Sequence, residues 1–132
     1  MKIIADTNVL LRFVLADDPE QYKLALDSME KSEAVAVSTH ALCEMAWVLR
    51  SRYGVSRSAI AATIRGLLET RNFVLDSAAV NAGLTTLDYG ADFADGVIAY
   101  EGRWLGGETF VSFDKKAVAA VAKQGMKAEL LG

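Results

Sequence analysis

Two apolar segments of the chain, each predicted to be a strand, lead directly into an aspartate. Asp6 follows Ile3-Ile4-Ala5, a run too short for a helix and predicted to be a fully buried strand, and Asp114 follows Phe110-Val111-Ser112-Phe113. If both strands are parallel and central in one sheet, their carboxyl ends meet at one edge, where ligand sites of such sheets lie. The two carboxylates are therefore expected side by side.

Three further carboxylates are expected at the same edge. Glu44 is the only charged residue between Ala41 and Leu49, one turn inside a helix that follows the second predicted strand. Asp92 and Asp95 are three residues apart at the start of a later helix, so they share a face of it. The pattern predicts a cluster of four or five acids.

Such a cluster requires protons or a cation. Two unit charges about 4 Å apart repel by roughly 4 kcal/mol at an effective dielectric of 20. Oxygen ligands without histidine or thiolate favour a hard ion, Mg²⁺ or Mn²⁺, over zinc. A metal held in this way binds phosphate oxygens and activates water for in-line attack on a phosphodiester.

Each acid also has a structural interpretation, which the sequence leaves open. Asp6 can begin a turn, and Asp114 can cap the helix that follows it. Asp92 with Asp95 matches a helix-capping pattern, in which aspartate meets exposed backbone N–H groups. Glu44 is harder to explain in this way, because glutamate is rarely left unpaired on an apolar helix face.

Other residue types with chemical potential are more weakly placed. His40, the only histidine, is either a general base or an ordinary histidine near a helix start. Cys43 is expected to be a small packing residue. Trp47 and Trp104 are expected in the core or at an interface, and not as platforms for base stacking.

The charge balance argues against binding to nucleic acid by bulk positive charge. Fourteen basic and 17 acidic residues give a net charge of −3, so a metal ion or a local basic stripe must supply any attraction. Five basic residues either line a phosphate track or form solvated faces. They are Arg50, Arg52, Arg57, Lys115 and Lys116.

The length and composition predict one globular domain over residues 1–132. Hydrophobic residues make up 52% of the 132 residues, and the single cysteine permits no internal disulfide, which fits a reducing, cytoplasmic setting. No secretory signal is expected, because Asp6 and Asn8 interrupt the apolar start. The apolar run 117–122 is far below the roughly 20 residues that a membrane span needs.

Strand and helix patterns alternate along the chain. Strands are predicted at 2–5, 34–38, 73–75, 109–113 and 127–131. Helices are predicted to begin after Asp17-Asp18, Ser38 or Thr39, Ser56, Ser77, Asp92 and Asp114. This order predicts an α/β domain with a mostly parallel sheet.

Four acidic motifs in this order resemble a known family. They are Asp6-Thr7-Asn8-Val9-Leu10-Leu11-Arg12, the helix 42–49 around Glu44, the segment 90–99 with Asp95, and Phe110-Val111-Ser112-Phe113-Asp114. Together they resemble the PIN domain, and within it the VapC-type toxins of bacterial toxin–antitoxin pairs, over essentially the whole chain. The resemblance implies a three-layer α/β/α domain with a central, mostly parallel sheet, and a metal-dependent endoribonuclease.

The resemblance also implies roles for individual residues. Asp6, Glu44, Asp95 and Asp114 match the four family acids. Asp6, Asp95 and Asp114 would hold Mg²⁺ or Mn²⁺ directly or through water, whereas Glu44 would hold a second metal or orient the attacking water. Asp92 would be an auxiliary metal or water ligand, and Asn8 and Ser112 match small polar positions that support the pocket.

Partners follow from the resemblance alone. It implies an RNA substrate, a cognate antitoxin that inserts a peptide over the active site, and a toxin homodimer.

Two functions other than a ribonuclease toxin are alternatives for this sequence. A phosphatase-type phosphotransfer domain needs a second aspartate two residues after the first, where this chain has Asn8, and a receiver needs one on a middle strand, which 35–39 lacks. A non-catalytic PIN-like binding module is the other, although the full set of acids argues against it.

Overall fold

The computed structural model describes all residues 1–132 as an α/β protein with seven helices and five strands. The helices are α1 (Thr7–Leu15), α2 (Pro19–Glu30), α3 (Thr39–Ser51), α4 (Arg57–Leu68), α5 (Ser77–Asp88), α6 (Phe93–Trp104) and α7 (Lys115–Ala122). The strands are β1 (Lys2–Ile4), β2 (Ala34–Ala36), β3 (Phe73–Val74), β4 (Thr109–Ser112) and β5 (Lys127–Leu130). No helix combines the length and apolar character that crossing a membrane requires.

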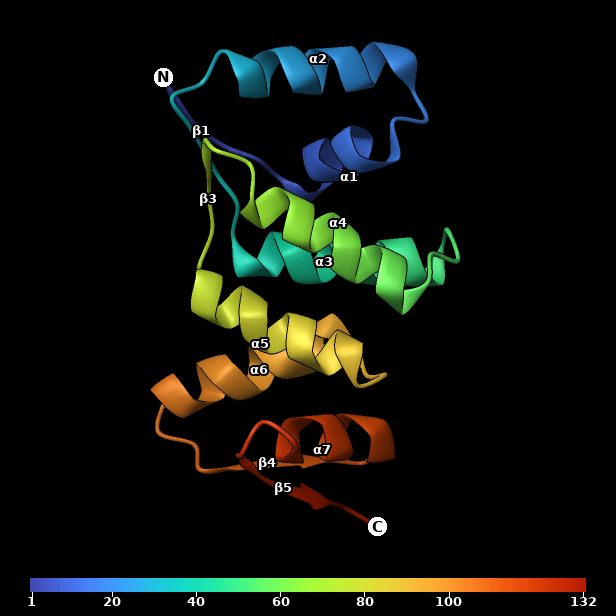
Figure 1. Cartoon of the computed structure of the whole chain (residues 1–132), viewed down its shortest axis with the longest axis vertical. Helices are drawn as coiled ribbons and strands as arrows, with labels where there is room; N and C mark the ends of the chain where they lie inside the picture. Colours follow the sequence, from blue (N-terminus) through green and yellow to red (C-terminus); the bar gives the residue numbers. More distant parts are fainter.

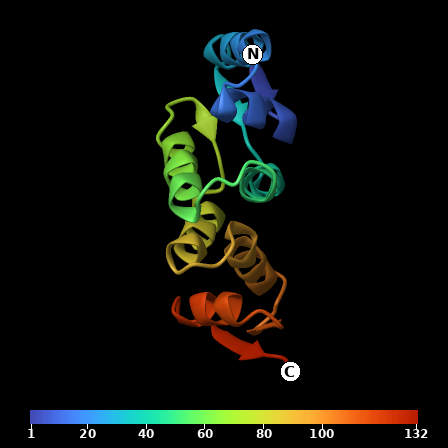
Figure 2. The ribbon, with the colours of Figure 1, turned by 90° about the vertical axis from the view of Figure 1, so that its right-hand side faces the viewer.

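All strand pairs are parallel, as predicted, but the strands form two sheets. One sheet has the order β1-β2-β3, with Ile3 beside Val35, and the other pairs β4 with β5, with Val111 beside Glu129. The prediction of one central sheet in which β1 and β4 meet is therefore wrong in this respect. Figures 1 and 2 show the reason: the α5–α6 hairpin lies between the two sheets, and α7 packs beyond it with β4 and β5.

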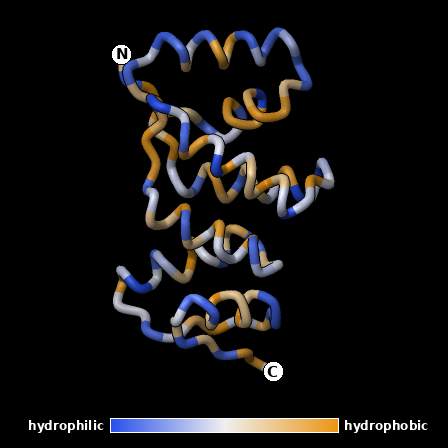
Figure 3. Tube along the Cα trace, viewed as in Figure 1, coloured by the Kyte–Doolittle hydropathy of each residue, from blue (hydrophilic) through white to orange (hydrophobic).

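One connected apolar core fills the region of the first sheet and helices α1 to α6. Its fully buried members include Leu10, Leu42, Met45, Ile60 and Phe93. The end of the chain packs differently, because α7 buries only the small residues Ala117, Ala120 and Val121. The outer helix α2 is largely hydrophilic along its length (Figure 3), as expected for a helix that covers the core from one side.

Side-chain caps fix the start of most helices, as the sequence patterns predicted. Asp18, Ser38 and Ser56 each accept a hydrogen bond from the backbone N–H three residues later. Helix α1 was not predicted: Asp6 caps it by accepting from the Val9 N–H at 2.9 Å. The apolar spacing of Val9, Leu10 and Phe13 after a capping aspartate is the signal that indicates this helix.

The predicted burial of the first strand is wrong. Ile4 is 85% exposed, because β1 has a neighbour on one side only. Val111 on β4 and Phe113 after it are 53% and 80% exposed. Parallel strands are ordinarily buried on both faces, so β1 and β4 each leave an unpaired edge together with apolar side chains in solvent.

Helices α5 and α6 approach each other closely at two glycines. A Cβ on Gly96 would lie 2.2 Å from the Ala82 carbonyl oxygen, and one on Gly83 would lie 2.5 Å from the Phe93 ring. Only a residue without a side chain permits this approach. The two glycines therefore set the position of α6 and of the acids at its start.

Candidate active site

One group of site residues gathers where β1 and β2 lead into their helices. Asp6 lies between β1 and α1, and the next residue, Thr7, donates its hydroxyl to Oε1 of Glu44 at 3.2 Å. Glu44 projects from α3, and its side chain is 54% exposed. The hydrogen bond joins the residue after Asp6 to Glu44, so the start of α1 lies beside this part of α3.

His40 belongs to the same group. Its Nε2 lies 2.9 Å from Oε1 of Glu44, one helical turn further along α3. Glu44 thus has a cation-forming partner as well as the Thr7 hydroxyl. The cap of α3 is Ser38 and not His40, and the contact that the structure gives His40 is with the Glu44 carboxylate.

A second acidic group lies at the start of α6. Asp95 is half-buried in the first turn, and this burial raises its pKa above the ordinary value of 3.8. The negative charges of Asp92 and Asp114 raise the pKa further, whereas the positive charge of Arg57 opposes them. Asp92 and Asp114 therefore lie close enough to Asp95 for their charges to act on it.

Asp92 begins α6 but makes no side-chain capping bond. Its Oδ1 instead accepts a hydrogen bond from Nη2 of Arg57, on α4, at 3.1 Å. The capping interpretation of Asp92 is therefore wrong, since the carboxylate is committed to a cation 35 residues away in sequence.

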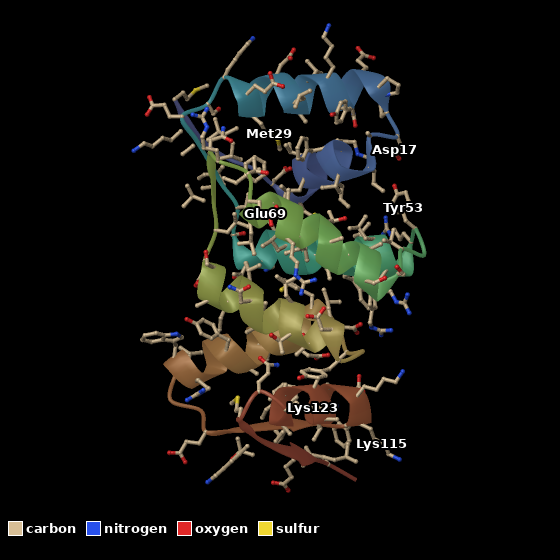
Figure 4. The ribbon with its side chains drawn as sticks, in the orientation of Figure 1. Asp17, Met29, Tyr53, Glu69, Lys115 and Lys123 are labelled. Atoms are coloured by element: carbon tan, nitrogen blue, oxygen red, sulfur yellow. The ribbon has the colours of Figure 1, made fainter.

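Asp114 does act as a cap. Its Oδ1 accepts from the N–H groups of Lys116 and Ala117 at 2.9 and 3.4 Å, and Lys115, labelled in Figure 4, begins the capped helix. Ser112 supports this turn, because its Oγ accepts from the Asp114 N–H at 3.0 Å. Capping leaves the carboxylate exposed at the helix start, and so does not prevent a further ligand from binding.

A cavity of about 230 Å³ opens beside the second group, between α3, α4 and α6. Its polar lining consists of Arg50, Arg57, Asp92 and Asp95, and Trp47 stands at its rim. Cys43 also lines it; burial raises the pKa of this thiol to about 11, so it stays protonated at neutral pH. The expected packing role of Cys43 agrees with this environment.

The sequence profile of the PIN domain matches residues 3–124. The chain belongs to the PIN domain family. No curated protein matched it in a separate search. PIN domains are typically metal-dependent nucleases, and the match extends over every acid singled out from the sequence.

Within this PIN domain, the two acidic groups remain separate. No three acidic, histidine or cysteine side chains are placed so that they could hold one metal ion. The expected meeting of Asp6 with Asp114 does not occur, because β1 and β4 belong to different sheets. The side chains as arranged therefore do not fit a metal ion.

Of the two polar residues expected to support the pocket, Ser112 supports the turn at Asp114, but Asn8 lies elsewhere. Asn8 is exposed and lines a groove between α1 and α2, away from Glu44. Thr7, between Asp6 and Asn8, makes the contact to Glu44 instead. The Thr7 hydroxyl in the motif Asp6-Thr7-Asn8 is the feature of the sequence from which this contact could have been predicted.

Trp47 and Trp104 are 66% and 79% exposed, so neither is a core residue.

Proposed function

We propose that this PIN domain is a metal-dependent endoribonuclease and the toxin of a toxin–antitoxin pair. The observation that carries the proposal is the family match over residues 3–124, which includes four acids in the expected order. The catalytic acids are Asp6, Glu44, Asp95 and Asp114. The phosphotransfer alternative is disfavoured, because that chemistry needs aspartates that the chain lacks at the required positions.

The role of Mg²⁺ or Mn²⁺ depends on a rearrangement that unites the two acidic groups. We propose that β1 and β4 pair in parallel in the active form, so that Asp6 and Asp114 leave one sheet edge together. The unpaired edges of both strands support this proposal, as do the exposed side chains of Ile4 and Val111. Pairing would satisfy backbone groups and bury apolar surface.

The decisive test of the nuclease proposal is cleavage of a structured RNA by the purified protein. Cleavage is expected with Mg²⁺ or Mn²⁺ and should stop when EDTA is added. A variant that retains the helix cap but not the charge, Asp6→Asn, should be inactive. Full activity in EDTA, or in this variant, would overturn the proposal.

The toxin role is tested in cells. An acidic site on an acidic protein should attract an arginine or lysine from an inhibitory peptide, which supplies the missing positive charge. Expression of this protein alone in the cytoplasm should arrest the growth of the cells. Co-expression with a small protein encoded beside this chain should relieve arrest and give a stable complex, and the toxin should purify as a homodimer. A harmless protein that copurifies with nothing would remove the basis of this role.

A non-catalytic PIN-like module is the second candidate. The absence of any three-residue metal-binding group in the described arrangement favours it. Binding of RNA without cleavage under every metal condition, and unchanged RNA binding in the Asp6→Asn variant, would identify a module of this kind.

A further inference from the structure

The cavity between α3, α4 and α6 has the size of a small ligand site. At about 230 Å³ it is smaller than the roughly 300–1,000 Å³ of pockets that take drug-sized ligands. It therefore suits one planar ring system. A long peptide or several nucleotides would extend well beyond it.

The charges of the cavity balance one another. Arg50 and Arg57 contribute two positive charges, and Asp92 and Asp95 contribute two negative charges. A phosphate would gain little from this lining, because each arginine that attracts it is offset by an aspartate that repels it. A neutral group that offers both hydrogen-bond donors and acceptors is the better complement.

The hydrogen-bonding capacity of the cavity is only partly used. Arg57 makes one side-chain hydrogen bond, from Nη2 to Asp92, which leaves other N–H donors of its two Nη atoms unused. Arg50 makes one long bond, from Nη1 to the Val55 carbonyl oxygen at 3.4 Å. Guanidinium groups carry five N–H donors, so both arginines retain donors for a ligand.

The walls of the cavity suit an aromatic ring. Ile60 and Phe93 form apolar lining and are each 1% exposed. Trp47 stands at the rim with 66% of its surface exposed. An exposed indole beside an apolar pocket is a platform on which a base can stack, contrary to the role expected for Trp47 from the sequence.

We propose that this cavity binds a guanine base of the substrate RNA, an inference that rests on the proposed ribonuclease function. Guanine presents O6 and N7 as paired acceptors for a guanidinium, and its N1–H and N2–H groups are paired donors for a carboxylate. Adenine and uracil present neither of these paired edges, and cytosine lacks the paired donors. Arg57 with Arg50 reads the acceptor edge, Asp92 receives the donor edge, and Trp47 stacks on the ring.

The test is RNA binding without cleavage. Short labelled single-stranded RNAs of equal length, differing only in one central base, are titrated in EDTA and followed by fluorescence anisotropy. The guanine RNA should bind about five- to 140-fold more tightly than the other three, the range expected for one well-formed bidentate pair. Equal affinity for all four RNAs would overturn the proposal.

Matched variants separate base reading from general binding. Arg57→Lys keeps the charge but loses the planar fork, so the guanine preference should disappear, whereas Arg71→Lys, outside the cavity, should retain it. Arg50→Lys is the second test, should Arg57→Lys unfold. Trp47→Ala should weaken all four RNAs at least about fivefold, and Trp104→Ala should not. Equal effects of the two tryptophan variants would contradict the stacking role.

The outcomes also separate this inference from the function on which it rests. Metal-dependent cleavage without a guanine preference would refute the guanine site and leave the nuclease intact. A guanine preference in a protein that cleaves no RNA would refute the nuclease proposal alone.

Discussion

The hydroxyl of Thr7 and the carboxylate of Glu44 are joined by a hydrogen bond of 3.2 Å, although 37 residues separate them in sequence. Nε2 of His40 lies 2.9 Å from the same oxygen, Oε1 of Glu44. Glu44 is thus held from two directions: from the start of α1 and from its own helix. The orientation of this exposed carboxylate is a property of the fold, and it does not depend on a bound ligand.

Loss of the Thr7 hydroxyl should therefore impair cleavage more than folding. Thr7→Val is expected to reduce kcat/KM at least about tenfold, since a hydrogen bond to a charged group contributes about 1.5–3 kcal/mol. Thr7→Ser keeps the hydroxyl and should retain most activity. Cleavage kinetics together with thermal unfolding check this expectation. Equal activity of the two variants would show that the contact has no part in the reaction.

Variants of Asp6 and Asp114 should distinguish a role in catalysis from a role in stability, because both residues are also helix caps. Asparagine caps a helix about as well as aspartate, so Asp6→Asn and Asp114→Asn should abolish cleavage while the melting temperature stays near that of the wild type. The alanine variants should lose activity and, in addition, about 0.5–2 kcal/mol of stability. If the asparagine variants cleave RNA normally, the two aspartates are caps only.

Asp95 should destabilise the metal-free protein at neutral pH. Because burial and the charges of Asp92 and Asp114 raise its pKa above 3.8 in the folded state, the folded protein binds this proton more tightly than the unfolded chain. The stability that Asp95 contributes is present below the unfolded pKa and is lost as pH rises through the folded pKa.

Asp95→Asn should accordingly raise the melting temperature at pH 7 in EDTA, and the difference from the wild type should shrink at acidic pH. Mg²⁺ should stabilise the wild type more than the variant, by mass action. Thermal unfolding of both proteins over a pH series, with and without Mg²⁺, provides the measurement. A lower melting temperature for the variant at pH 7, with equal responses to metal, would place Asp95 outside the metal site.

The close contact of α5 and α6 should be intolerant of a single methyl group. A Cβ on Gly96 would meet the Ala82 backbone oxygen at 2.2 Å, and backbone cannot yield as a flexible side chain does. Gly96→Ala should cost about 1–3 kcal/mol. Gly66→Ala on α4 is the control, because nothing lies within 4 Å of its Cβ position; it should stabilise by roughly 0.5–1 kcal/mol. Chemical denaturation measures both, and a neutral Gly96→Ala would show that the two helices can move apart.

Pairing of β1 with β4 can be detected by a disulfide. If Asp6 and Asp114 align, Ile4 lies opposite Ser112, so Ile4→Cys with Ser112→Cys in a Cys43→Ser background should oxidise within one chain when Mg²⁺ and RNA are present. Cα atoms of bridged cysteines lie about 4.4–6.8 Å apart, which the separate sheets do not offer. The control pair, Val74→Cys with Ser112→Cys, starts from the outer strand β3 and should stay reduced. No cross-link under any condition would contradict the pairing.

The sequence alone determined the features that depend on neighbouring residues. Strand and helix order, and the caps at Ser38 and Asp114, could be predicted because a cap bonds to N–H groups only two or three positions ahead. The same local logic placed Glu44 on a helix face and Asp95 in the first turn of another. Helix α1 was missed although its signal, a capping Asp6 before apolar residues, is local as well.

The tertiary structure decided which elements lie together, since these contacts join residues far apart in the chain. The close approach at Gly83 and Gly96 fixes the α5–α6 hairpin, and this hairpin separates β4 from β1. Arg57 donates a hydrogen bond to Asp92, 35 residues away in sequence. The side chain of Trp47 remains exposed to solvent. Periodicity and local propensity carry no information on such pairings, because their free energy arises from packing and charge that exist only once the chain has folded.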